Sequence, residues 1–175
     1  MWGAAAPDLP EGARCVMLVG SPAGAADTSA AVSARADRVL FVGYGDLTAE
    51  GMADRLDERL QDPPPVRSLG VGEDIEPGDL TGQGIAVADA LSPGTAVRLD
   101  RLDALLGDVD REPAFEFIHS LAEGCARASA SMHVHLAVDA VNDRTVVALS
   151  TLMDAVLDVA DDSVTVRPAL TGGDL

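Results

Sequence analysis

The stretch that most constrains the fold is residues 15–34, CVMLVGSPAGAADTSAAVSA. Residues 15–19 are apolar, Gly20 and a loop of small residues follow, and the Ala-rich remainder predicts a helix over about 27–36. A strand, a loop and a helix in this order are typical of a phosphate-binding loop, where backbone N–H groups and a helix N-terminus converge on an anion. The candidate phosphate-contacting residues are Gly20, Ser21, Pro22, Gly24, Ala26, Asp27 and Thr28.

The lysine that completes such a loop is missing. Alignment on Gly20 puts the expected Lys-Ser or Lys-Thr pair at Ala26 and Asp27, and a shift by one residue puts Asp27 at the lysine position and Thr28 at the hydroxyl. All twelve basic residues are arginines. Two like charges at ~4 Å repel by about 1 kcal/mol even in water. We therefore expect Asp27 to repel phosphate and to cap the helix with the N–H groups that a phosphate would use.

The rest of the chain alternates apolar runs with helical patterns. Strands are predicted at 15–19, 39–45, 66–71, 95–100, 132–138, 154–159 and 163–168, and helices at 27–36, 49–61, 80–91, 112–130 and 144–152, with Thr48 and Asp79 as N-caps. This order predicts an α/β fold, a three-layer α/β/α sandwich whose mostly parallel sheet ends in a C-terminal antiparallel hairpin. We expect an N-terminal arm at 1–13, a single domain at 14–170 and a tail at 171–175.

The charge balance restricts the partners and the environment. The chain carries 29 acidic and 12 basic residues, a formal net charge of −17, and only 3% aromatic residues. Such an acidic surface with a small-residue core indicates the cytoplasm of a salt-accumulating halophile, and the alternative is an acidic protein from a GC-rich genome. Nucleic acid is not expected as a partner, because the arginines are scattered and form no basic face.

Membrane association is also not expected. No uncharged apolar run approaches ~20 residues, and the N-terminal segment lacks a basic leader and is interrupted by Pro7 and Pro10. Cys15 and Cys125 lie among apolar or small neighbours and are expected to be buried, reduced thiols. These features predict a cytoplasmic protein.

Several stretches resemble a known superfamily when they are taken in order. VMLVGSPAGAADTSA, VLFVGYGD and VRLDRLDAL resemble the RecA-like P-loop ATPases, in the archaeal branch of KaiC-like and gas-vesicle-regulator-like proteins. GDLTGQGIAVADAL and HVHLAVDAVNDRTVVALSTLMDAV are similar to uncharacterised haloarchaeal members whose phosphate-binding loop is degenerate. The resemblance covers residues 15–168 and implies a RecA-like sheet.

The resemblance implies that most of the ATPase chemistry has been lost. The acidic pair that activates water in the family falls on Gly45 and Asp46, so half of it remains. The aspartate that helps to hold magnesium falls on Asp100, and the Ser or Thr that usually follows it is Arg101. We therefore assign no catalytic residue and no metal ligand, and keep Asp46 and Asp100 as remnants of a nucleotide site.

Three other groups of residues have alternative interpretations. His133 and His135 share one face of a strand and could hold a metal with a third ligand from Asp139 or from a neighbouring strand end, or could simply be hydrogen-bonded. Ser21 follows a strand as a hydrolase nucleophile does, but the pattern G-x-S-x-G is absent. Arg98, Arg101 and Arg111 could form an anion site, or could neutralise the neighbouring carboxylates Asp100, Asp103, Asp108 and Asp110.

Three functions remain open. The first is a non-catalytic RecA-like domain that regulates or scaffolds through a protein partner or a homo-oligomer, with no cofactor or with residual weak binding of ATP and magnesium. The helix at 80–91 is a candidate contact, because Gly82 and Gly84 permit close approach. The second is an active KaiC-like ATPase with a non-standard site that uses arginine in place of lysine. The third, a recombination accessory that binds DNA, is opposed by the charge.

The carboxylate excess generates a prediction about folding. Below about 0.1 M KCl the Debye length reaches ~10 Å, so neighbouring carboxylates repel one another and the protein should unfold or aggregate. Circular-dichroism melts should show a transition temperature that rises steeply from low to molar KCl. A melt that is the same in both solutions would contradict the prediction.

Overall fold

The structure is a computed structural model that describes residues 8–137, 139, 141–160 and 164–168. The first seven residues of the expected arm and the expected tail at 171–175 lie outside the described residues. Within the described part of the arm, Leu9 packs against an apolar cluster that includes Val16, Leu18 and Leu157. This contact ties the chain before the first strand to the sheet.

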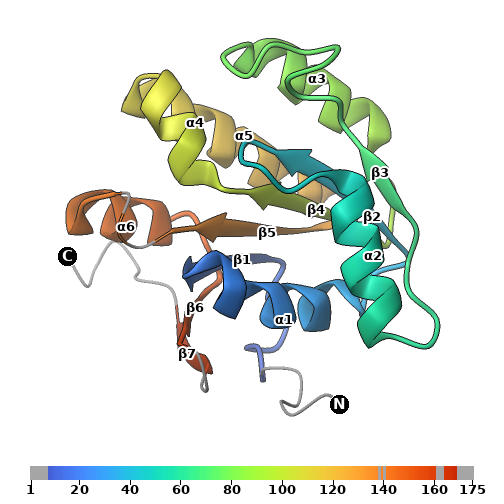
Figure 1. Cartoon of the computed structure of the whole chain (residues 1–175). Coiled ribbons are helices and arrows are strands. Elements are labelled where there is room, and N and C mark those ends of the chain that lie inside the picture. Colours follow the sequence, from blue (N-terminus) through green and yellow to red (C-terminus); the bar gives the residue numbers. More distant parts are fainter. Residues whose placement is uncertain (1–7, 138, 140, 161–163, 169–175) are drawn as a thin grey trace.

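Seven strands form one sheet in the order β3-β2-β4-β5-β1-β6-β7 (Figure 1). The strands are β1 Cys15–Gly20, β2 Arg38–Gly43, β3 Val66–Ser68, β4 Thr95–Asp100, β5 Ser131–Leu136, β6 Ala155–Val159 and β7 Val164–Pro168. The β6–β7 pair is antiparallel, and all the other pairs are parallel. The predicted mostly parallel sheet with a C-terminal antiparallel hairpin is confirmed.

Helices cover both faces of the sheet (Figure 1). The helices are α1 Pro22–Ser33, α2 Ala49–Arg59, α3 Leu80–Ala90, α4 Leu102–Asp108, α5 Arg111–Ala128 and α6 Asp143–Ser150. α1 and α2 pack on one face, and the core of the other face is shared by α3, α4, α5 and α6. The three-layer sandwich is confirmed. The predicted caps are confirmed too, because Thr48 and Asp79 accept hydrogen bonds from the N–H groups of Gly51 and Gly82.

The two faces of the sheet differ in chemistry. On the face toward α3–α6, alternate residues of β1, β4 and β5 such as Met17, Leu99 and Val134 join one large apolar core. On the face toward α1, alternation brings polar and charged residues of β4 and β5 into the interior: Arg98, Asp100, His133 and His135, each 3% exposed or less. Buried charges require partners, so the helix that covers them must supply some.

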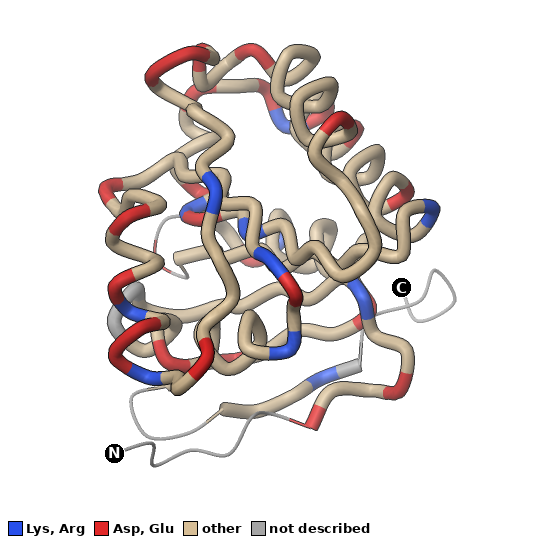
Figure 2. The backbone as a smooth tube through the Cα atoms, turned by 90° about the vertical axis from the view of Figure 1, so that its right-hand side faces the viewer, with Lys and Arg blue, Asp and Glu red and all other residues tan. Residues whose placement is uncertain are grey.

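The acidic residues are distributed over the outside of the molecule. In Figure 2, Asp and Glu lie along helices and connections all around the outline rather than in one patch. No helix in the described part of the chain is long and apolar enough to cross a membrane.

The carboxyl end of β1 generates a prediction. Gly20 pairs with Val159 of β6 so closely that a Cβ at Gly20 would overlap the Val159 carbonyl oxygen. Gly20→Ala should therefore destabilise the protein by about 1–3 kcal/mol in chemical unfolding, as overpacking does. Gly107→Ala is the matched control, because its Cβ would meet no atom within 4 Å and the change favours helix α4. Equal effects of the two changes would contradict the close approach.

Candidate functional site

The carboxyl ends of β1, β4 and β5 meet at one edge of the sheet, where parallel α/β proteins bind ligands. His135 Nε2 lies 3.1 Å from the Gly20 carbonyl oxygen, to which it can donate, and His135 Nδ1 lies 3.6 Å from Asp100 Oδ1. The structure thus brings Gly20, at the start of the candidate loop, together with Asp100, which the resemblance predicts at a magnesium position. A histidine that the sequence did not connect with either residue joins them.

The predicted phosphate-binding loop is replaced by helix. α1 begins at Pro22, directly after the N-cap Ser21, and not near Asp27 as predicted. The prediction was wrong because Ser followed by Pro is itself a signal for the start of a helix. A serine side chain caps the helix N-terminus, and proline is tolerated at the first helical position because no N–H donor is needed there. Gly24 and Ala25 donate their N–H groups to the side chain and the carbonyl of Ser21, respectively. N–H groups that a loop would direct at a phosphate are therefore engaged within the chain.

The residues at the lysine position lie within the helix. Asp27 does not cap α1, contrary to the prediction; its carboxylate instead pairs with Arg59 of α2, with Nε and Oδ1 2.5 Å apart. Ala26 is half-buried, and Thr28 is buried at 5% exposure. The charge of Asp27 is thus directed at α2.

An arginine side chain lies against Gly45, where the resemblance predicts the first residue of an acidic pair. A Cβ on Gly45 would lie 2.7 Å from Cγ of Arg101, so Arg101 crosses the place where a longer side chain would begin. Arg101 has a left-handed φ of 62° and makes two-point hydrogen bonds to the buried Asp103, with the shortest N–O distance 2.8 Å. Asp46 is exposed beside them. Of the two residues of the predicted pair, Gly45 therefore packs against Arg101 and Asp46 faces solvent.

Asp103 anchors this arrangement. It accepts hydrogen bonds from Arg101 and from the backbone N–H of Ala137 at 3.0 Å. Burial alone would raise the pKa of the Asp103 carboxyl, but these hydrogen bonds and the Arg101 charge outweigh burial and hold the pKa below its usual range. Asp103 is therefore an ionised anchor for Arg101.

Asp100 is engaged in a buried ion pair. Arg98 Nη2 donates to Asp100 Oδ1 at 2.7 Å, and both side chains are at most 4% exposed. Burial acts to raise the pKa of the Asp100 carboxyl, but the contact with His135 and the charge and hydrogen bond of Arg98 outweigh it and hold the pKa low. Burial also lowers the pKa of Arg98, which Asp100 opposes. The Asp100 carboxylate is thus the counter-ion of Arg98 in this fold.

Helix α1 completes the polar cluster. Arg98 Nη1 donates to Ser29 Oγ, and His133 Nε2 lies 3.4 Å from both Ser29 Oγ and Ser33 Oγ. Arg98 Nε and His133 Nδ1 find no hydrogen-bond partner among the described residues. We refer to Arg98, Asp100, His133, His135, Ser29 and Ser33 as the buried polar cluster.

The structure decides between several of the sequence alternatives. Arg98 and Arg101 neutralise Asp100 and Asp103, and the Arg111 guanidinium lies 5.3 Å from the centre of the Phe115 ring. His133 and His135 are hydrogen-bonded inside the sheet, and the described residues contain no group of three His, Cys, Asp or Glu side chains placed to hold a metal ion.

Cys15 and Cys125 are buried and free, as predicted. Burial raises the pKa of the Cys15 thiol to about 12.

Sequence reasoning missed the cluster as a unit, although two signals were present. Strand alternation puts residues 98 and 100 on one face, and residues 133 and 135 on one face. The register that sets Arg98 beside His133 depends on β4 and β5 being neighbours, which only the sheet order provides.

Comparison with known proteins adds the family and the fold. The sequence pattern described as "Family of unknown function (DUF7504)" matches residues 3–159. No curated protein matches the sequence. A structure described as a structural study of PH0250 from Pyrococcus horikoshii OT3 is similar with a TM-score of 0.60 and 8% identity, over 93% of this chain and 89% of that chain. At that identity the likeness shows the fold alone.

Two further solved structures are more distantly similar. One is the flagellar accessory protein FlaH from Methanocaldococcus jannaschii, with a TM-score of 0.48 and 10% identity over 95% of this chain and 81% of that chain. The other is an ATPase from the type III secretion system of pathogenic bacteria, with a TM-score of 0.49 and 15% identity over 85% of this chain and 51% of that chain. The mostly parallel sheet of this chain, with its C-terminal hairpin, is consistent with a RecA-like fold.

The buried polar cluster generates a prediction about pH. Burial and the charge of Arg98 hold the pKa of His133 well below 6.5. Below pH 6.5, His133 therefore takes up a proton in the unfolded chain but stays neutral in the folded chain. The free energy of unfolding should therefore be unaffected by His133 above pH 6.5 and should decrease as the pH falls below it, by up to about 1.4 kcal/mol per pH unit. Chemical unfolding between pH 7 and pH 5 should show the slope, and His133→Asn should remove it. His119→Asn, at an exposed ring, is the control that should keep it.

Proposed function

This chain belongs to the DUF7504 family, and we propose that it is a non-catalytic RecA-like domain, a pseudo-ATPase that regulates or scaffolds through contacts with other proteins. The observation that supports the proposal most is the ion pair between Arg98 and Asp100, because the Asp100 carboxylate, which we take as the magnesium position, is buried and already paired. A metal ion there would have to displace a buried arginine, which would leave that arginine unpaired.

Two further observations support the same proposal. α1 begins at Pro22, so the chain between β1 and the helix is reduced to the cap residue Ser21. The side chain of Arg101 crosses Gly45, where the resemblance to RecA-like ATPases predicts a carboxylate that activates water. Each of the three positions with ATPase chemistry thus has an internal occupant in this chain, and we take the phosphate-binding loop to be degenerate.

The competing function, an ATPase that uses arginine in place of lysine, has less support. Arg59 contacts Asp27, one candidate for the lysine position, and its charge is paired with the Asp27 carboxylate. The acidic composition and the absence of lysine support an origin in a halophilic archaeon and a cytoplasmic location.

Nucleotide binding tests the proposal directly. Titration calorimetry with ATP and magnesium in molar KCl should give no heat of binding, and turnover should not exceed background. Binding of micromolar strength, or turnover of ~0.1 per second that Asp100→Asn abolishes, would contradict the proposal.

A variant that carries the lysine and threonine of a phosphate-binding loop tests whether ATP binding lacks only these side chains or also the loop conformation. Ala26→Lys with Asp27→Thr restores the two expected residues, but they would stand within α1 rather than at its start. We therefore expect no gain in ATP affinity in the same titration. A gain would show that the loop can form and that the lost side chains alone silence the site.

A further inference from the structure

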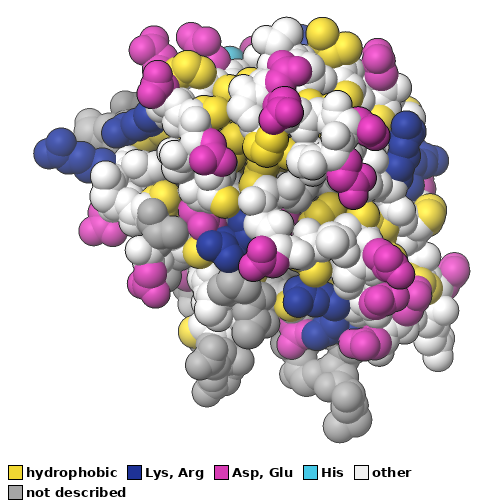
Figure 3. All heavy atoms as spheres, turned by 45° about the horizontal axis from the view of Figure 1, so that its top comes forward, with side chains coloured by type: hydrophobic (Ala, Val, Ile, Leu, Met, Phe, Trp, Pro, Cys, Tyr) yellow, Lys and Arg dark blue, Asp and Glu magenta, His cyan; other side chains and the backbone are white. Residues whose placement is uncertain are grey.

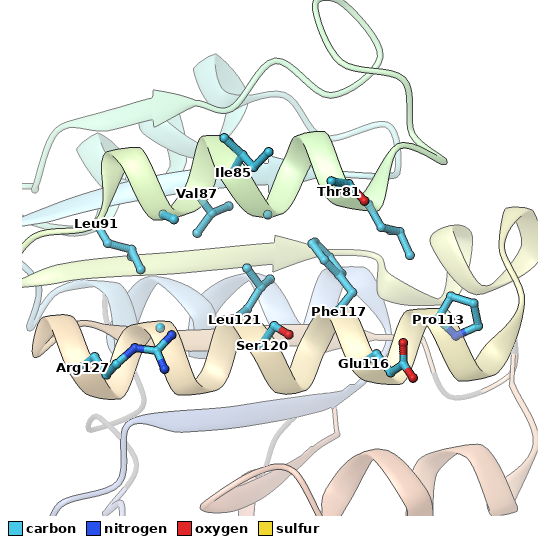
Figure 4. A pocket seen from close by; sticks show the side chains of 14 residues that line it. Thr81, Ile85, Val87, Leu91, Pro113, Glu116, Phe117, Ser120, Leu121 and Arg127 are labelled. Atoms are coloured by element: carbon cyan, nitrogen blue, oxygen red, sulfur yellow. The ribbon is translucent and has the colours of Figure 1, made fainter.

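A groove of about 500 Å³ runs between α3 and α5, away from the buried polar cluster (Figure 4). Its walls are mainly apolar, and their larger side chains are Leu80, Ile85, Val87 and Leu91 of α3 and Phe117 and Leu121 of α5. The groove is hollow because small residues face it. A Cβ at Gly84 would meet no atom within 4 Å, and one at Gly124 would touch Leu91 alone.

Ile85 stands beside this hollow. Its side chain is 60% exposed. In the described part of the chain, the other large hydrophobic side chain with high exposure is Val147 on α6, at 41%. Figure 3 shows hydrophobic side chains in the middle of the face that α3 and α5 help to form, with acidic side chains around them. An exposed apolar side chain thus lies next to an apolar hollow on the same surface.

The charged residues in the groove lie at its two ends. Glu116 and Arg127 are the charged residues among those that line it (Figure 4). They are on the same helix, and a rise of ~1.5 Å per residue separates them by about 16 Å. The lining therefore has one negative end, one positive end and no net charge, so it favours neither a basic nor an acidic partner.

We propose that this groove binds the same groove of a second copy of the chain about a two-fold axis. In a two-fold interface the same patch faces itself, so a projection and a hollow on one patch fill each other twice. Ile85 of each copy would enter the hollow beside Gly84 of the other. With the two α5 helices antiparallel, Glu116 of each copy faces Arg127 of the other.

The size of the patch sets the expected strength. Helices of 11 and 18 residues are roughly 16 and 27 Å long, and two helices side by side span ~20 Å. Such a patch buries about 600–1,000 Å² in total, below the ~1,200–2,000 Å² of stable dimers. The dimer should therefore exchange rapidly with a Kd in the micromolar range. Two copies of net charge −17 repel, so association should strengthen with added KCl.

This inference rests on one part of the proposed function, namely that the chain acts through protein contacts, and it identifies a homo-oligomer. Its test uses no nucleotide. Failure of the dimer would therefore leave the pseudo-ATPase proposal standing, and ATP binding would leave the dimer standing.

Sedimentation equilibrium of the full chain in KCl, over low to high micromolar protein, tests the dimer. Ile85→Glu should weaken association at least about tenfold, because it puts a charge into the partner's apolar hollow. Val147→Glu is the matched control: it adds the same charge at the other exposed hydrophobic residue and should change Kd by less than ~2-fold. Circular dichroism should show both variants folded, since both positions are exposed.

Charge reversal tests the antiparallel arrangement. At moderate KCl, Arg127→Glu should weaken the dimer about 5- to 20-fold, because it sets two carboxylates against each other at both ends of the interface. Adding Glu116→Arg should restore Kd to within ~2-fold of wild type, at the same net charge as wild type. A monomer at every concentration, a dimer indifferent to Ile85→Glu, or a failure of the double variant to recover would each overturn the proposal.

Discussion

The buried ion pair between Arg98 and Asp100 determines how the α1 face of this fold is built. Moving a guanidinium and a carboxylate out of water costs several kcal/mol for each ion, and only close, well-hydrogen-bonded geometry offsets that cost. Here the pair is 2.7 Å apart, Ser29 accepts from Arg98, and His135 lies against Asp100. Because Ser29 belongs to α1, the same pair that neutralises the strand also positions the helix above it.

This arrangement links the sheet to the candidate site. His135 connects Asp100 with the carbonyl of Gly20, the last residue of β1, and Ser21 then starts α1 at once. A phosphate-binding loop needs free N–H groups and an open carboxyl end of β1. In this chain the Ser21 side chain accepts a hydrogen bond from an N–H group in the first turn of α1. At the carboxyl end of β1, the Gly20 carbonyl contacts His135. The carboxyl end of β1, the start of α1 and Asp100 are therefore parts of one packed unit.

The sequence was sufficient for the fold because its patterns are local. Apolar runs, the caps Thr48 and Asp79, and the short separation of β6 from β7 predicted the layers and the hairpin. Asp100 at the end of β4 was also predictable, as was the neutralisation of Arg98 and Arg101. The start of α1 was missed because a glycine-rich loop and an Ala-rich helix look alike without weighing Ser21 and Pro22. The role of His135 was missed because it depends on which strands are neighbours.

A double-mutant cycle on the ion pair tests the central claim, that Asp100 is a structural counter-ion rather than a silent metal ligand. Arg98→Met and Asp100→Leu should each cost about 3–5 kcal/mol of unfolding free energy, because each leaves one buried charge unpaired. The double variant should cost much less than the sum of the two, which gives a large coupling energy. Additive effects, or a stabilisation by Asp100→Leu such as removal of a functional carboxylate produces, would contradict the account.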